Sequence, residues 1–175
     1  MSIAQSLLPE FDMEMANTRK TLERVPEDKL SYTPHAKSMT MQALASHLVD
    51  IPGWAVPTLL QDSLDLAPPG APKWEPTLYG SRTQMLETFD KNVAAAREAL
   101  SKTTDQDFMR NWSLLMGGNV MFAMPKIAVM RSMIMNHAIH HRAQLAVYLR
   151  MNDVPVPALY GPSADEGQMG AGASA

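Results

Sequence analysis

Three histidines in one short helical segment are the residues of this sequence with the clearest capacity for chemistry. The segment is NHAIHHRAQLAVYLR, residues 136–150, and within it His137 and His141 stand four positions apart. On an α-helix this spacing places two side chains one above the other on the same face. The apolar stripe predicted for the helix runs through both positions, so both imidazoles are expected to point inward. A buried imidazole without partners for its ring nitrogens costs on the order of 1–3 kcal/mol.

A shared metal ion would satisfy both rings, because neutral imidazole is the commonest metal ligand. His47 offers a third ligand, since it stands three residues after Leu44 and four before Ile51 on the apolar face of another predicted helix. Most lone His-x-x-x-His pairs are exposed or hydrogen-bonded to nearby groups, so the hypothesis depends on this third residue. Histidines from two helices can converge inside a helical bundle. We therefore predict a metal site formed by His47, His137 and His141.

The predicted site has the composition of a catalytic metal centre. Three histidine ligands leave open positions that water or substrate can complete. Imidazole nitrogens are borderline-soft donors, which suits zinc, nickel, cobalt or iron and not calcium or magnesium. The chain has no cysteine, which excludes disulfides, thiolate ligands and cysteine nucleophiles. No Ser-His-Asp order or paired-carboxylate motif offers a competing chemistry.

Several other residues have structural interpretations that we favour over chemical ones. His140 lies about 100° around the helix from His141 and is expected on a flank or in solvent. His35 is expected to be an exposed loop residue. Asp50 could orient a ligand imidazole, although solvation on the helix surface is an equal alternative. Glu14 and Asp50 are weak candidates for acid–base helpers.

Arg142 and the tryptophans have similar alternatives. The guanidinium of Arg142 could bind an anionic substrate near the metal, but a surface ion pair is favoured. Trp54, Trp74 and Trp112 are expected to be core or pocket-wall aromatics and not stacking platforms.

The composition is that of one globular domain. The chain has 175 residues, of which 46% are hydrophobic and 19% are charged. Its formal charge of −3 argues against non-specific nucleic-acid binding. It has no apolar run of about 18 residues and no signal-peptide pattern, so no membrane partner and a cytoplasmic location are expected.

Four segments have a helical period of apolar residues. The first ends before Pro26, and the second opens at Ser38 and is kinked or interrupted at Pro52–Gly53. The third starts at Ser81 in a candidate capping box, and the fourth starts at Pro125. These four segments favour an all-α fold, an antiparallel four-helix bundle.

The connections complete this prediction. A Pro-rich loop covers residues 64–80, and Gly117–Gly118 between two short apolar runs predicts a hairpin-like excursion before the last helix. A single domain is expected over residues 1–166. The sequence GQMGAGASA, residues 167–175, is expected to be a flexible C-terminal tail because it has few large apolar side chains.

The same residues resemble the DinB-like family, the DinB/YfiT-like metalloenzymes. The stretch NHAIHHRAQLAVYLRMNDVPVPALYGPSADE is similar to the C-terminal signature of that family, and ASHLVDIPGW is similar to the segment that carries its first metal histidine. The resemblance extends from about residue 5 to residue 166. One departure is Ala143, which stands where the family commonly has glycine.

The resemblance implies a four-helix bundle, often a homodimer, with His47, His137 and His141 at the three metal-ligand positions. Related members include thiol-dependent enzymes such as mycothiol-dependent maleylpyruvate isomerase and bacillithiol transferases. We therefore expect a divalent transition metal (zinc, nickel or iron) and an enzyme that acts on a small molecule with a low-molecular-weight thiol. An S-transferase or isomerase is favoured. The alternatives are a metal-dependent hydrolase and a non-catalytic metal-binding or stress-response module that forms dimers.

Overall fold

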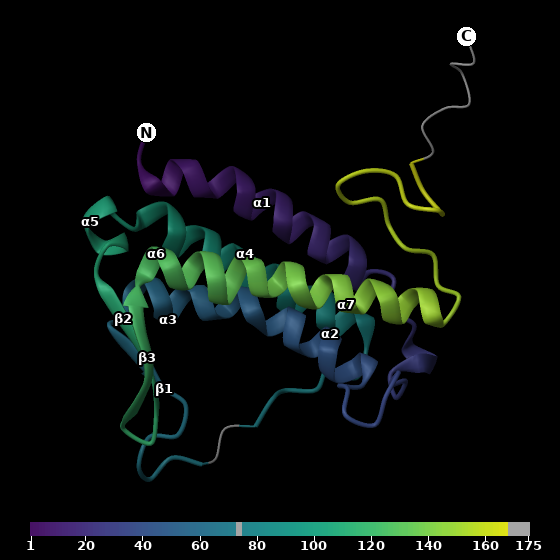
Figure 1. Ribbon diagram of the computed structural model, residues 1–175, viewed down its shortest axis with the longest axis horizontal. Helices are drawn as coiled ribbons and strands as arrows, with labels where there is room; N and C mark the ends of the chain where they lie inside the picture. Colours follow the sequence, from purple (N-terminus) through teal and green to yellow (C-terminus); the bar gives the residue numbers. More distant parts are fainter. Residues whose placement is uncertain (73–74, 168–175) are drawn as a thin grey trace.

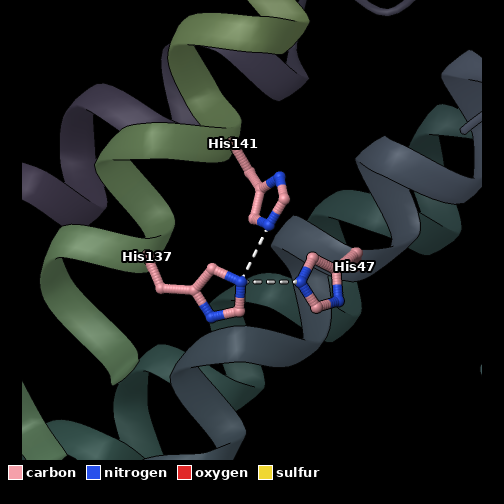
Figure 2. A group of neighbouring side chains, drawn as sticks. All are labelled: His47, His137 and His141. Atoms are coloured by element: carbon pink, nitrogen blue, oxygen red, sulfur yellow. Dashed lines mark hydrogen bonds between the residues drawn. The ribbon is translucent and has the colours of Figure 1, made fainter. Parts of the chain in front are cut away.

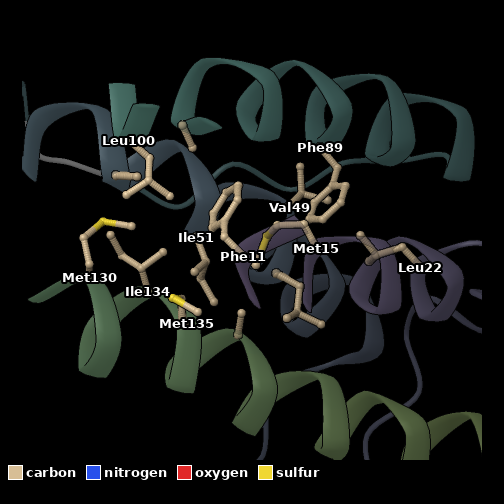
Figure 3. Close-up of a cluster of buried hydrophobic side chains, with 14 of the residues drawn as sticks. Phe11, Met15, Leu22, Val49, Ile51, Phe89, Leu100, Met130, Ile134 and Met135 are labelled. Atoms are coloured by element: carbon tan, nitrogen blue, oxygen red, sulfur yellow. The ribbon is translucent and has the colours of Figure 1, made fainter. Parts of the chain in front are cut away.

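The computed structural model describes residues 1–72 and 75–167. Its long helices lie side by side around one core (Figure 1). They are α1 (Ile3–Leu22), α2 (Met41–Asp50), α4 (Arg82–Lys102) and α7 (His137–Met151). Helices α1 and α2 each pack against both α4 and α7. Figure 3 shows how Phe11 of α1, Phe89 of α4 and Ile134 fill the space between them.

Side-chain caps fix where the first two of these helices begin. Ser2 forms a capping box with Gln5, because its hydroxyl accepts from the Gln5 backbone N–H and the Gln5 side chain accepts from the Ser2 N–H. Helix α2 was predicted to open at Ser38, which is wrong. Thr40 caps it instead, since its hydroxyl accepts from the backbone N–H of Ala43.

Helix α4 begins directly after Ser81, as predicted. The Ser81 hydroxyl accepts from the Gln84 backbone N–H at 3.2 Å. In place of the second hydrogen bond of the predicted capping box, the Gln84 side chain accepts from the backbone N–H of Gly80.

The chain leaves the α-helical path at Pro52–Gly53, as the sequence predicts. One 3₁₀ turn, η2 (Ile51–Trp54), joins α2 to the short α3 (Ala55–Leu60). The Asn92 side chain of α4 donates to the Val49 carbonyl at 2.9 Å, which gives a partner to a backbone group at this break. A Cβ at Gly53 would lie 3.3 Å from the Asn92 side chain, so glycine suits this close approach.

The expectation of a purely all-α four-helix bundle is wrong, because a three-stranded mixed sheet lies at one end of the helices (Figure 1). Strands β2 (Asn111–Met116) and β3 (Asn119–Pro125) form an antiparallel hairpin, and β1 (Ser63–Asp65) pairs with β2 in parallel. The sequence predicted an excursion at the hairpin but no sheet. Three residues at the start of a Pro-rich segment are too short to show the alternation of a strand.

The hairpin turn is held against the loop that follows β1. Gly117 and Gly118 both have positive φ, 60° and 79°, which is the conformation that a type I′ turn requires. The Asp65 carboxylate accepts from both of their backbone N–H groups, at 2.9 and 2.7 Å, and from that of Ala67 at 2.9 Å. These hydrogen bonds, led by that of Ala67, hold the pKa of Asp65 below its usual range.

The last helical stretch starts after Pro125, as predicted, but is not uniformly α-helical. A short α6 (Lys126–Val129) runs into a π-helical segment, η3 (Met130–Asn136), which continues as α7. Because π-helical turns hold more residues than α-helical turns, the positions that follow are rotated about the helix axis. At His137 and His141 the predicted inward stripe is displaced, and Ala138 and Arg142 take the buried positions. Further along the same predicted stripe, Leu145 and Tyr148 are buried as expected.

Short helices complete the described part of the chain, η1 (Glu27–Lys29) and α5 (Asp105–Phe108). After α7 the chain runs to Gly167, and ion pairs from Arg24 to Glu166 and from Arg150 to Asp165 hold this segment. The predicted tail lies outside the described residues from position 168. Within the described ranges, no helix combines the length and the apolar character needed to cross a bilayer.

Candidate metal centre

The three histidines singled out in the sequence come together, although 90 residues separate the first from the second (Figure 2). His47 reaches across from α2, and His137 and His141 project from successive turns of α7. The Nε2 atom of His137 lies 3.2 Å from that of His47 and 2.8 Å from that of His141. One ligand atom from each residue lies within 4.8 Å of the other two.

The Nδ1 atoms of His137 and His141 point away from the cluster, and their hydrogen bonds show which nitrogen of each ring carries the proton. The Nδ1 atom of His137 lies 3.2 Å from the Met133 carbonyl oxygen, and that of His141 lies 2.8 Å from Oε1 of Gln144. Both oxygens can only accept a hydrogen bond, so each Nδ1 carries the proton. The Nε2 atoms are then acceptors that face one another, and neutral rings place no proton between them.

This arrangement fits a metal ion. The facing lone pairs of His137 and His141 repel at 2.8 Å, whereas a cation bound between them would attract both. It would also attract Nε2 of His47 when that ring carries its proton on Nδ1. Hydrogen bonds from Nδ1 to carbonyl oxygens are the usual means by which proteins orient metal-ligating histidines. The donor set of three imidazole nitrogens suits zinc, nickel, cobalt or iron.

The electrostatics of the site keep the rings in the neutral form that binds metal. Burial, and to a smaller extent charge repulsion from the nearby His141 and His137 rings, together lower the pKa of His47 to about 4. Burial is also the main cause of the lowered pKa values of His137 and His141. At neutral pH all three side chains are therefore uncharged.

The rings are less deeply buried than the sequence predicted. All three are half-buried and lie at the margin of the core stripe. Trp54 packs against two of them, with its ring centroid 5.4 Å from that of His47 and 5.8 Å from that of His137. The prediction that Trp54 forms a pocket wall is confirmed, because its indole lines a cavity beside the site.

That cavity measures about 800 Å³, and His137 forms part of its wall. It lies among η2, α3, the sheet and η3. Most of its wall is aromatic or aliphatic. The described residues that line it are Trp54, Thr58, Leu64, Asp65, Leu66, Pro68, Ala71, Pro72, Trp112, Leu114, Phe122, Val129, Met133, Ile134 and His137.

Trp112, His35 and His140 lie outside the three-histidine cluster. Trp112 is buried and donates from Nε1 to the Pro57 carbonyl at 3.1 Å, in agreement with the pocket-wall prediction. Trp74 lies outside the described residues. His35 and His140 are exposed, as predicted.

Asp50 has a partner other than a ligand imidazole. Its carboxylate accepts from the Tyr79 hydroxyl at 2.7 Å. Burial raises the pKa of Asp50 and, with the Asp50 carboxylate as a further cause, raises the pKa of Tyr79 to about 12. The Tyr79 phenol is therefore protonated at neutral pH and can donate to Asp50.

Arg142 forms an ion pair, but the prediction that it lies on the surface is wrong. Its Nη2 lies 2.6 Å from Oε2 of Glu14, and their side chains are 2% and 4% exposed. The Tyr160 hydroxyl donates to the same Glu14 oxygen at 2.6 Å. Glu14 is therefore occupied in a buried ion pair and is not an acid–base helper at the histidine cluster.

Sequence reasoning missed the groups that orient the histidines. Gln144 stands three residues after His141, a spacing that brings side chains together on a helix and could have identified it. The Met133 carbonyl had no such signal, because it is a backbone group of the π-helical segment. Nothing in the sequence indicated that segment.

Comparison with known proteins places the chain in a family. The chain belongs to the DinB family, whose model matches residues 1–172. A DinB-like protein from Bacillus cereus ATCC 10987 has 25% sequence identity and a TM-score of 0.69, over 91% of this chain and 98% of that one. A DinB-like protein from Bacillus subtilis has 17% identity and a TM-score of 0.63, over 86% and 95%. No curated protein matches the chain.

Proposed function

We propose that this protein is a metal-dependent enzyme in which His47, His137 and His141 bind one divalent transition-metal ion. The observation that carries the proposal is the convergence of three Nε2 atoms at the wall of an apolar cavity. We further propose that it joins the sulfur of an intact low-molecular-weight thiol to an electrophilic carbon of a small molecule, with loss of the thiol proton and of the leaving group on that carbon. Alternatively, the thiolate adds to the small molecule and leaves again after the adduct has isomerised.

The number of ligands supports a reactive site over a purely structural one. Structural zinc sites are usually closed by four protein ligands, whereas catalytic sites keep a position for water or substrate. In the part of the chain that the structure describes, the potential ligand group contains the three histidines and no carboxylate. A cavity against one of these histidines gives a substrate access to the open position.

A divalent metal bound here would lower the pKa of a coordinated thiol or water toward neutrality. The protein's own residues prepare this position. The Met133 carbonyl and Gln144 orient the rings of His137 and His141, and burial keeps both rings neutral. Trp54 packs against His47 and His137, and the apolar cavity wall offers few groups that hold water beside this position.

A thiol is the favoured nucleophile for two reasons. The family resemblance implies thiol-dependent relatives, and because the chain has no cysteine, a thiol would have to come from a cosubstrate. The apolar wall favours a poorly hydrated nucleophile and an apolar electrophile over attack by water.

A homodimer and a cytoplasmic location remain predictions.

The proposal is tested by assaying the metal-reconstituted protein with a panel of low-molecular-weight thiols and electrophiles, with and without a chelator. Zinc, nickel and iron forms are compared. We expect turnover above the protein-free reaction, loss of that turnover with chelator, and its loss in His141→Ala. The matched control His140→Ala changes the exposed neighbour and should retain activity.

One outcome would contradict the enzymatic proposal. If the metal-loaded protein gives no turnover above the protein-free rate, and His141→Ala only lowers the melting temperature, the site stabilises the fold. The non-catalytic alternative would then hold. Turnover that needs metal but no thiol would instead indicate a hydrolase.

A further inference from the structure

The cavity beside the histidine cluster indicates the chemical class of the substrate. Resting on the proposed function, we propose that the cavity binds an uncharged, predominantly apolar molecule and places one end of it against His137. The expected substrate is therefore a neutral apolar electrophile and not an organic acid.

Apolar side chains from separate elements face this space. Trp54 comes from η2 beside the histidines, and Ile134 comes from η3. Leu114 and Phe122 are directly paired across strands β2 and β3, and both line the cavity. A ligand among these side chains would lose contact with water on several sides, which favours binding in proportion to its apolar area.

The size of the cavity suits a small organic molecule. About 800 Å³ lies within the roughly 300–1,000 Å³ of sites that bind drug-sized ligands. Sites of this kind combine an apolar wall with a few placed polar groups. Thr58, which is 1% exposed, and His137 are polar groups of this wall. They limit the polar part of the ligand to a small region.

The charge of the wall disfavours an anionic ligand. Of the described residues that line the cavity, Asp65 is the one that carries a full charge at neutral pH. Its oxygens already accept three backbone N–H groups, which keeps it ionised. Away from the histidine cluster, where a bound metal ion would itself attract an anion, the described lining contains no lysine or arginine to pair with a carboxylate. An acid group in that part of the cavity would be desolvated without a partner and repelled by Asp65.

Two fluorescent probes that share one ring system test this inference. N-phenyl-1-naphthylamine is neutral, and 8-anilino-1-naphthalenesulfonate is the same molecule with a sulfonate. We expect the neutral probe to bind the full-length protein with one-to-one saturation. The sulfonate should bind at least about tenfold more weakly, a difference of about 1.4 kcal/mol. Equal or tighter binding of the sulfonate would overturn the inference.

Variants locate the binding. Leu114→Trp fills the cavity with an apolar side chain, and the matched control Met121→Trp places the same side chain at an exposed position outside the cavity lining. Leu114→Trp should weaken the neutral probe at least about tenfold, whereas Met121→Trp should leave it unchanged. Leu114→Ala enlarges the cavity, so it should retain binding and show that the site tolerates substitution. Equal probe affinity in all three variants would place the probe elsewhere and overturn the inference.

Zinc titration separates failure of this inference from failure of the proposed function. If zinc binds through the three histidines but the neutral probe does not saturate, the inference is wrong and the metal proposal survives. If the probe binds as expected but zinc does not bind, the metal proposal is wrong. The substrate assignment, which rests on that proposal, then fails with it, although the cavity's preference for neutral ligands survives.

Discussion

His141 and Arg142 are adjacent in the sequence but belong to polar clusters of opposite kinds. Arg142 points into the core, where Glu14 supplies the opposite charge. His141 lies at the margin of the core and meets two further imidazoles. One cluster joins complementary groups, whereas the other brings together groups of the same type.

The difference lies in how completely the polar atoms are paired. In the Arg142 cluster the guanidinium donates to the Glu14 carboxylate at 2.6 Å, to the Glu14 carbonyl at 2.9 Å and to Thr18 at 3.2 Å. In the histidine cluster the outer nitrogens of His137 and His141 are paired, but the inner ones face one another as acceptors. The first cluster is complete within the protein, whereas the second is a group of ligand atoms that could hold a cation.

Arg142→Met should have the largest effect on stability. It leaves the Glu14 carboxylate buried without its partner, which typically costs about 3–5 kcal/mol. Urea unfolding should show this loss. Adding Glu14→Leu should recover much of it, because the double variant has no unpaired buried charge. A loss below about 1 kcal/mol in the single variant would contradict the assignment of this cluster to structure.

His137→Ala should have the largest effect on metal binding. It removes the ring whose Nε2 lies nearest to both other ligand atoms. Zinc affinity measured by calorimetry should fall by more than the roughly 10–100-fold that loss of an outer hydrogen-bond partner typically causes. His140→Ala is the control and should bind zinc as the wild type does. An unchanged zinc affinity in His137→Ala would show that the histidine cluster is not the zinc site.

The contrast between these clusters also explains what the sequence could reveal. The His137–His141 spacing and the place of His47 in a helical stripe identified the three residues, because both are local features. The Arg142–Glu14 ion pair joins residues 128 positions apart, so the sequence offered only a charged residue of unknown surroundings. In the helix that follows the π-helical segment, Arg142 takes the buried position and His141 lies at the margin.

For the fold too, local features of the sequence were predictable and long-range pairings were not. The four long helical segments followed from apolar periodicity, and the hairpin turn at Gly117–Gly118 followed from its glycine pair, whereas η1, α5 and the π-helical segment were not predicted. Strand β1 did not, because three residues carry too little pattern and its partner β2 is about 50 residues away. The cavity was not predicted for the same reason, since Leu64 and Asp65 of strand β1 form part of the cavity wall.

Gln144→Ala should have an intermediate effect on zinc affinity, which distinguishes the metal-binding cluster from the structural one. Gln144 accepts from Nδ1 of His141 but is not itself a ligand. Its loss should lower zinc affinity about tenfold, with little change in unfolding free energy because the residue is exposed. Gln144→Glu retains an acceptor and should retain the affinity. If both variants bind zinc equally weakly, the hydrogen bond is not what orients His141.

Tyr160→Phe should have a smaller effect, confined to stability. It removes the hydroxyl that donates to Glu14 at 2.6 Å. The expected loss is about 0.5–1.5 kcal/mol, with zinc affinity unchanged. A changed zinc affinity would show that the two clusters are coupled.

Low pH should reduce the folding stability of the metal-free protein because it protonates His47. The unfolded chain binds a proton at His47 near pH 6.5, whereas the folded protein binds it only near pH 4. Unfolding therefore takes up protons in this window, so this contribution to stability is complete above about pH 6.5 and is lost as the pH falls toward 4. His47→Gln should make the melting temperature less dependent on pH between these values. An equal slope in both proteins would contradict the lowered pKa.

X-ray absorption at the zinc edge of the reconstituted protein tests the central claim most directly. We predict one zinc per chain with three imidazole nitrogens at about 2.0–2.1 Å and one further scatterer from solvent or thiol. A spectrum without imidazole scattering, or a protein that retains no zinc at one equivalent, would contradict it.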